Sequence, residues 1–128
     1  MKLRFFRKSK HLVFKAPKCL PEKPQVVGSP EVKAITMQDI ATDSWLKERE
    51  VSFRRMLAEG HVGLQLIEPV SMHAVAYGWI AMNGLRPDHI PEIPEKACWL
   101  HFDRVRDEYQ GRGYHRLLIY ERLKLIYT

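Results

Sequence analysis

The sequence has little cysteine and no long hydrophobic run. Its 128 residues include two cysteines, Cys19 and Cys98, and neither belongs to a CxxC pair. We therefore expect two free thiols in a reducing compartment rather than a disulfide or a zinc site. No stretch approaches the roughly 18 consecutive apolar residues of a membrane-spanning helix. These absences favour a cytoplasmic protein without a membrane span, and the length is that of one domain.

An excess of positive charge is absent from most of the chain. Residues 1–24 hold eight basic side chains and one acid, a net charge of +7, whereas the other 104 residues hold 13 basic and 14 acidic side chains, a net charge of −1. Proteins that follow a phosphate backbone spread Lys and Arg over a folded face. We therefore divide the chain into a basic, proline-containing arm, residues 1–30, and a domain, residues 31–128, that we do not expect to bind nucleic acid. The arm leaves open a mitochondrial-type presequence, or contact with nucleic acid or an anionic membrane.

Several familiar catalytic and metal-binding motifs are missing. The sequence has no GxxxxGK[ST] phosphate-binding loop, no GxGxxG that opens an early βαβ unit and no GxSxG elbow. Its six histidines show no HxH or HxxxH spacing. We therefore predict no metal site.

Strand and helix patterns alternate along the domain. Strands are predicted over residues 11–16, 32–35, 61–67, 72–82 and 97–105, and helices over 38–59 and 113–127. Prolines predict an extended connector over residues 17–30 and a loop over 83–96. A capping box from Thr36 to Asp39 opens the first helix. This order predicts the α/β (α+β) class, with a mostly antiparallel sheet flanked by helices.

The turn between the last strand and the last helix is the most informative stretch. It reads Gln110-Gly111-Arg112-Gly113-Tyr114-His115 and leads directly into the helix. Successive N–H groups of such a turn point into one concavity, and the positive end of the helix dipole adds to them. The turn therefore predicts an anion site for a phosphate or pyrophosphate, although Gly-x-Gly at this place is also common in plain turns.

Gln110 and Gly113 also carry a family resemblance. Together with Val105 in the preceding strand, they resemble the acyl-coenzyme A binding motif of the GNAT (N-acetyltransferase) superfamily. That motif runs Gln or Arg, two residues of any type, Gly, any residue, then Gly or Ala, and His115 stands where Gly or Ala is usual. Residues 32–36 with Asp39 are similar to the family's first strand and helix start, and residues 77–80 to its third strand.

The resemblance implies an activity and a cofactor site. The pyrophosphate of acetyl-CoA, or of another acyl-CoA, is expected on the amides of Gln110, Gly111, Arg112, Gly113, Tyr114 and His115. The pantetheine arm is expected to pair with the backbone near Val105. A small-molecule amine would then attack the thioester directly while a general base takes its proton.

The last predicted strand offers candidates for that base. Strict alternation places Trp99, His101, Asp103 and Val105 on one face, and Cys98, Leu100, Phe102 and Arg104 on the other. His101 is the natural proton acceptor, because the reference pKa of histidine is about 6.5. Asp103 would orient His101 or bind the amine. The alternative is that both are solvated polar residues of a half-buried strand.

The end of the sequence departs from the family pattern. GNAT domains continue with further strands beyond this helix, whereas the sequence stops at Thr128. The resemblance therefore implies a domain that is incomplete at its C-terminal end, with residues 117–119 and 125–126 partly exposed and a homodimer partner covering the last helix. Two functions stay open: an acyl-CoA-dependent N-acyltransferase, or a non-catalytic GNAT remnant that serves as a binding or interaction module. The sequence names neither the acceptor nor the acyl chain.

Overall fold

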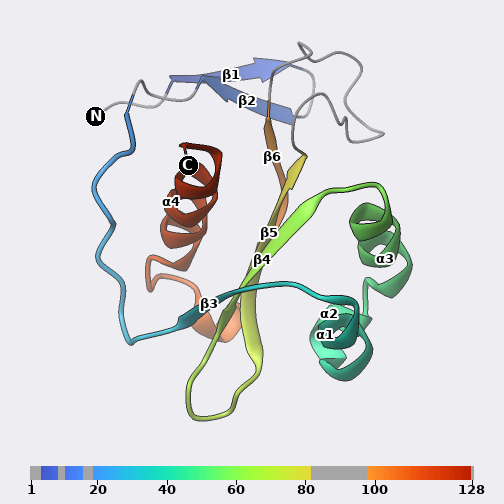
Figure 1. Ribbon diagram of the computed structural model, residues 1–128. Coiled ribbons are helices and arrows are strands. Elements are labelled where there is room, and N and C mark those ends of the chain that lie inside the picture. Colours follow the sequence, from blue (N-terminus) through green and yellow to red (C-terminus); the bar gives the residue numbers. More distant parts are fainter. Residues whose placement is uncertain (1–3, 9–10, 16–18, 82–97, 128) are drawn as a thin grey trace.

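A computed structural model describes residues 4–8, 11–15, 19–81 and 98–127 (Figure 1). Its elements are β1 (Arg4–Lys8), β2 (His11–Lys15), β3 (Glu31–Ala34), α1 (Met37–Thr42), α2 (Ser44–Lys47), α3 (Glu50–Ala58), β4 (Val62–Ile67), β5 (Ala74–Ala81), β6 (Trp99–Val105), a short 3-10 turn (Asp107–Tyr109) and α4 (Tyr114–Tyr127). The predicted loop over residues 83–96 lies outside the described residues. No helix in the described part of the chain is long and apolar enough to span a membrane.

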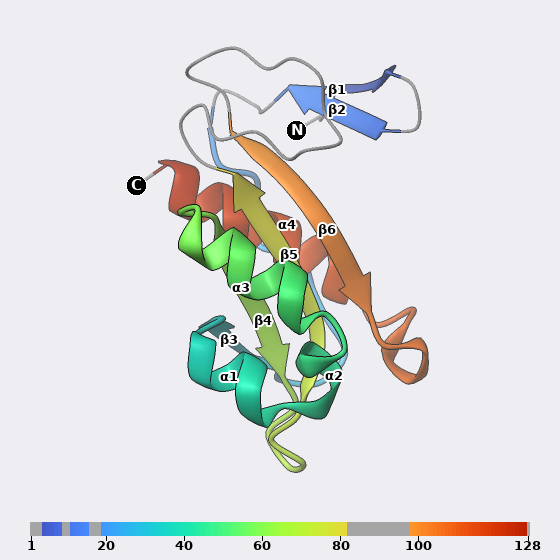
Figure 2. The ribbon, with the colours of Figure 1, turned by 90° about the vertical axis from the view of Figure 1, so that its right-hand side faces the viewer.

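The domain is a layer of sheet between two layers of helix. The strands lie in the order β3-β4-β5-β6, and every neighbouring pair is antiparallel. Helices α1, α2 and α3 cover one face, and α4 covers the other (Figure 1). The predicted mixed class, with an antiparallel sheet flanked by helices, is confirmed. Strand β6 is an edge of this sheet among the described strands (Figure 2).

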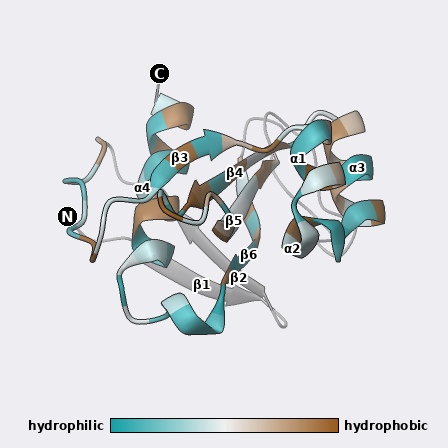
Figure 3. Cartoon of the chain, turned by 90° about the horizontal axis from the view of Figure 1, so that it is seen from below, coloured by the Kyte–Doolittle hydropathy of each residue, from teal (hydrophilic) through white to brown (hydrophobic). Residues whose placement is uncertain are grey.

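Hydrophobic side chains fill both spaces between the layers. All eight residues of β5 are buried, as expected for a strand with helices on both faces. Phe53 and Trp79 are central to the core under α1–α3, and Leu66 and Leu118 to the core under α4. Seen from below, the apolar strands β4 and β5 lie between α4 and the helices of the other face (Figure 3).

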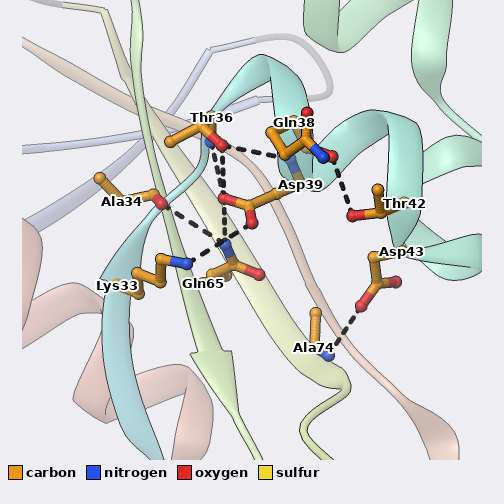
Figure 4. Close-up of polar contacts among 9 residues, drawn as sticks. All are labelled: Lys33, Ala34, Thr36, Gln38, Asp39, Thr42, Asp43, Gln65 and Ala74. Atoms are coloured by element: carbon orange, nitrogen blue, oxygen red, sulfur yellow. Dashed lines mark hydrogen bonds and ion pairs between the residues drawn. The ribbon is translucent and has the colours of Figure 1, made fainter.

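The single helix predicted over residues 38–59 is wrong, because Asp43 divides it. The backbone of Asp43 is extended, with ψ at 117°, so that it ends α1 and begins α2. Its Oδ1 accepts hydrogen bonds from the N–H groups of Trp45 and Leu46, and its Oδ2 accepts one from Ala74 N–H at 3.0 Å (Figure 4). A helix-capping carboxylate thus also fixes the start of β5. The hydrophobic spacing alone did not reveal the interruption.

The predicted capping box at Thr36 is confirmed. The Asp39 N–H donates to Thr36 Oγ1 at 3.1 Å, and the Thr36 N–H donates to Asp39 Oδ2 at 2.9 Å. Gln65 of β4 donates from Nε2 to the same Asp39 oxygen at 3.0 Å (Figure 4). The network attaches the start of α1 to the sheet.

The N-terminal segment holds one predicted and one unpredicted strand. The predicted strand is present as β2, and β1 pairs with it in a separate two-stranded sheet. The connector beyond residue 19 has no regular element and reaches α4, where Val26 joins the core. The connector thereby covers α4 on a second side, in addition to the side that packs on the sheet. Leu117 and Leu118 are buried, contrary to the expected exposure, whereas Leu125 is exposed.

Candidate functional site

A bulge in β6 determines how this strand presents its side chains. Trp79 of β5 pairs with His101 of β6. Tyr77 lies two residues before Trp79, but its partner Arg104 lies three residues after His101. One residue of β5 therefore opposes two of β6. Phe102 in this bulge has a φ of +55°, a left-handed value that is rare for a bulky side chain. Bulges are frequent beside functional sites, where they re-aim side chains.

The bulge overturns the predicted alternation along β6. Trp99 and His101 do lie on one face, since they pair with Ala81 and Trp79. Asp103, however, contacts α4 on the opposite face, and Val105 packs in the core beneath that helix. The extra residue shifts the period by one, which moves every later side chain to the other face.

His101 is consequently separated from Asp103. Its imidazole is buried on the α1–α3 face, with Nε2 lying 3.1 Å from Nδ1 of His61. His61 Nε2 in turn lies 3.6 Å from a carboxylate oxygen of Glu59. The predicted orientation of His101 by Asp103 is therefore wrong.

The partners of Asp103 are two side chains of α4. Its carboxylate forms a bidentate ion pair with Arg122, with Nη1 to Oδ1 at 2.6 Å, and His115 Nε2 lies 3.1 Å from Oδ2. Arg122 is 0% exposed. Burial alone would raise the pKa of Asp103, but the hydrogen bonds and charges of His115 and Arg122 outweigh it and lower the pKa. Asp103 is therefore a carboxylate over the neutral range.

Two features of β5 make room for the buried guanidinium. A β-carbon at Gly78 would lie 2.7 Å from Cζ of Arg122, so only glycine leaves space there. The carbonyl of Trp79 accepts a hydrogen bond from Arg122 Nη1 at 3.1 Å, next to the register shift. The bulge, Gly78 and the ion pair are thus one structural unit.

The turn before α4 presents a row of free N–H groups. The first hydrogen bond of the helix runs from Leu117 N–H to the Gly113 carbonyl at 3.0 Å. Within the described part of the chain, the N–H groups of residues 111–116 donate to no protein acceptor. Gly111 and Gly113 both have left-handed backbones, with φ of +81° and +86°. N–H groups arranged in this way can bind an anion, and the anion site at this turn stays a prediction.

A cavity lies over this turn, along the end of β6. Its volume is about 570 Å³. The predicted site residues that line it are Asp103, Val105, Gln110, Gly111, Gly113, Tyr114 and His115. Two predicted site residues, Arg112 and His101, do not line the cavity. The Arg112 guanidinium instead stacks on the Tyr109 ring, 4.6 Å from its centre. A more apolar cavity of about 400 Å³ adjoins it between α4 and the connector and shares His115 and Arg116.

The two glycines of the turn have different surroundings. A β-carbon at Gly111 would meet nothing within 4 Å, whereas one at Gly113 would lie 2.9 Å from the carbonyl oxygen of Gln25. The connector is also bonded here, since Val27 N–H donates to the Arg112 carbonyl and the Tyr114 hydroxyl donates to the Val27 carbonyl. Gly113 therefore serves the packing of the connector, and Gly111 faces the open side of the turn.

Sequence reasoning missed Arg104, Arg116 and Arg122. The first two line the cavity, and the third holds Asp103. Arg122 did leave a signal, because it lies four residues after Leu118 and four before Ile126, on one apolar face of the predicted helix. A charge on a face that must be buried requires a partner. The register shift that supplies Asp103 to it has no comparable signal in the sequence.

Comparison with known proteins does not assign the chain: no family model, no curated protein and no solved structure matches it. The function is therefore argued from the site itself and from the motif around Gln110 and Gly113.

Proposed function

We propose that the chain is an acyl-CoA-dependent N-acyltransferase of the GNAT type, acting on a small-molecule amine. The observation that carries the proposal is the cavity at the end of β6, beside the N–H groups of residues 111–116, which have no acceptor among the described residues. The GNAT-like motif supports it, because the cavity lies at the residues that the motif assigns to the cofactor.

The residues present fit the phosphate groups of an acyl-CoA. The open side of Gly111 leaves the turn N–H groups accessible to a diphosphate. Arg116 adds positive charge to the lining, while the charge of Asp103 is matched by Arg122. Acyl-CoA would supply the thioester that the amine attacks. The outer edge of β6 beside Val105 is unpaired among the described strands, which suits pairing with an extended pantetheine arm.

His115 replaces His101 as the proposed proton acceptor. It lines the cavity and is 59% exposed at its side chain. When Nε2–H donates to Asp103, the neutral imidazole keeps its lone pair at Nδ1, where it can take a proton from the amine. Asp103 then fixes this tautomer and the orientation of the ring. Asp103 is a positioning residue in this scheme.

A pair of substitutions at Gly111 tests the cofactor site. Asp and Asn both tolerate a left-handed backbone and have the same shape, but only Asp places a negative charge at the turn. We expect Gly111→Asp to weaken acetyl-CoA binding at least about tenfold relative to Gly111→Asn, as measured by calorimetry at constant ionic strength. Gly113 is unsuitable for this test because a side chain there would displace the connector.

Ligand-induced stabilisation gives an independent measurement. Acetyl-CoA at one hundred times its Kd should stabilise the fold by about 2.7 kcal/mol. Equal affinities of the two Gly111 variants, or the absence of any acetyl-CoA binding by the wild type, would contradict the proposal.

A binding module without catalysis is the second candidate. It needs only the cavity at the end of β6 and no proton acceptor. The two functions differ in turnover. A module would bind acetyl-CoA without releasing free CoA in the presence of a panel of amines, and light scattering would show whether the chain forms the expected homodimer.

A further inference from the structure

Two arginines meet on the face of β6 opposite the cavity-lining Asp103. Arg49 precedes α3, and Arg104 follows the bulge of β6. Both guanidinium groups lie at the hydroxyl group of Tyr77, which is 1% exposed, while both arginines are exposed to solvent. Two exposed like charges are thus held near one buried hydroxyl group.

No carboxylate balances these two charges within the described part of the chain. None of the ion pairs there involves Arg49 or Arg104. Two of the adjacent acids are already engaged, since Glu50 pairs with Arg54 and Asp103 pairs with Arg122 on the other face. Glu48, which precedes Arg49, forms no ion pair with either arginine among the described residues. Close like charges repel each other, so an anion placed between them would gain energy from both.

The buried hydroxyl between the arginines carries no compensating charge. Burial raises the pKa of Tyr77, and the charges of Arg104 and Arg49 reduce that rise without cancelling it. The phenol is therefore protonated at neutral pH and does not neutralise the two guanidinium groups.

An exposed aromatic ring stands beside the pair. Phe102 is 36% exposed despite its apolar side chain, and its strained φ of +55° aims it toward this face. Its ring packs edge-on against Phe53 at 5.4 Å, and the Arg49 guanidinium lies 5.9 Å from the ring centre. Strain of this kind persists where the surrounding structure enforces it, and it concentrates at ligand sites.

We propose that Arg49, Arg104 and Phe102 form a binding site for a small molecule that joins an apolar group to a carboxylate or a phosphate. The guanidinium groups bind the anionic oxygens, and the Phe102 ring contacts the apolar part. Arg104 also lines the cavity at the end of β6, so the site adjoins the proposed acyl-CoA site across the edge strand. An anionic molecule of this kind that also carries an amine is the acceptor, an assignment that rests on the proposed acyltransferase function, whereas anion binding does not.

Matched probes test the anion site without any acyl-CoA. The probes are 3-phenylpropanoate and phenyl phosphate, with 3-phenylpropanol as the neutral counterpart, titrated into the full chain and followed by two-dimensional NMR. We expect both anions to bind and the alcohol to bind at least about tenfold more weakly, since it lacks the charge-assisted hydrogen bonds. Preference for one anion distinguishes a carboxylate-bearing from a phosphate-bearing acceptor.

The variants are Arg49→Gln and Arg104→Gln, with Lys47→Gln as the control. Lys47 is an exposed cation of the neighbouring helix α2, so its loss changes the net charge equally. We expect each arginine variant to weaken anion binding at least about tenfold and the control to change it less than twofold. Equal effects of all three variants would overturn the proposal, because they would show general attraction to the charge of the molecule. So would tighter, competing binding of a single-stranded oligonucleotide through the same arginines.

A separate titration of wild-type protein with acetyl-CoA distinguishes the two failures. If the anions bind and acetyl-CoA does not, the anion site stands and its role as an acceptor site fails with the proposed function. If acetyl-CoA binds and neither anion does, the anion site is wrong and the proposed function stands.

Discussion

The arginines on the two faces of β6 differ in burial and in charge pairing. Under α4, Arg122 is fully buried and its charge is matched by Asp103. On the α1–α3 face, Arg49 and Arg104 are exposed and have no carboxylate partner among the described residues. Charges that a protein buries must be paired in the folded state, whereas unpaired exposed charges remain available to a ligand. The contrast predicts that Arg122 governs stability and that the other two govern binding.

The largest effect is expected where the buried pair is broken. Asp103→Asn keeps the shape of the side chain but leaves the Arg122 charge uncompensated in the core. We expect a loss of about 3 kcal/mol in the free energy of unfolding, measured with urea. The double variant Asp103→Asn with Arg122→Met should recover part of this loss, because no buried charge then remains. A loss below about 0.5 kcal/mol for the single variant would contradict the structural role of the pair.

The next effect concerns the space that Gly78 provides. Gly78→Ala would place a methyl group 2.7 Å from the Arg122 guanidinium, which is held by Asp103 and Trp79 and cannot move aside. We expect a destabilisation of about 2 kcal/mol in urea unfolding. In an Arg122→Met background the same substitution should cost clearly less, since the flexible side chain can yield. Equal costs in both backgrounds would mean that the glycine does not serve the arginine.

The same region shows why sequence predicted the elements better than the site. The strands and the last helix follow from apolar periodicity, and Thr36 and Asp39 carry a local capping signal. The turn at Gly111 and Gly113 could also be predicted from the sequence, because left-handed positions favour glycine. These features depend on residues close together in the chain.

The separation of His101 from Asp103 could not be predicted from the sequence, because it depends on one extra residue in β6. A bulge leaves no reliable local pattern, and it reverses the faces of all residues that follow. The helix break at Asp43 was not predicted for a related reason. Asp43 accepts a hydrogen bond from Ala74, 31 residues away, and this tertiary contact fixes the break between α1 and α2. Sequence periodicity describes elements, whereas the site depends on contacts between them.

Acid should sharpen the contrast between the faces by a smaller amount. The pKa of Asp103 is lowered in the folded state, so its contribution to stability is present above the ordinary aspartate pKa of about 3.9 and is lost as the pH falls below it. We expect wild-type protein to lose more unfolding free energy between pH 6 and pH 3 than the Asp103→Asn variant does. The comparison cancels the other carboxylates, including Asp39, whose pKa is also lowered. Parallel pH profiles of the two proteins would refute the role of this carboxylate.

The smallest effect is expected on the exposed face. Arg49→Gln and Arg104→Gln remove one of two neighbouring like charges, and neither breaks an ion pair among the described residues. The free energy of unfolding should therefore change by less than about 0.5 kcal/mol, with a slight gain at low salt that disappears in 1 M NaCl, where the Debye length is about 3 Å. Arg54→Gln is the matched control, because it removes an equally exposed arginine of α3 that does pair, with Glu50. It should show no such gain. A loss above about 1 kcal/mol for Arg49→Gln or Arg104→Gln would mean that these guanidinium groups hold the fold together, and the two faces of β6 would then not differ in the way that the ligand site requires.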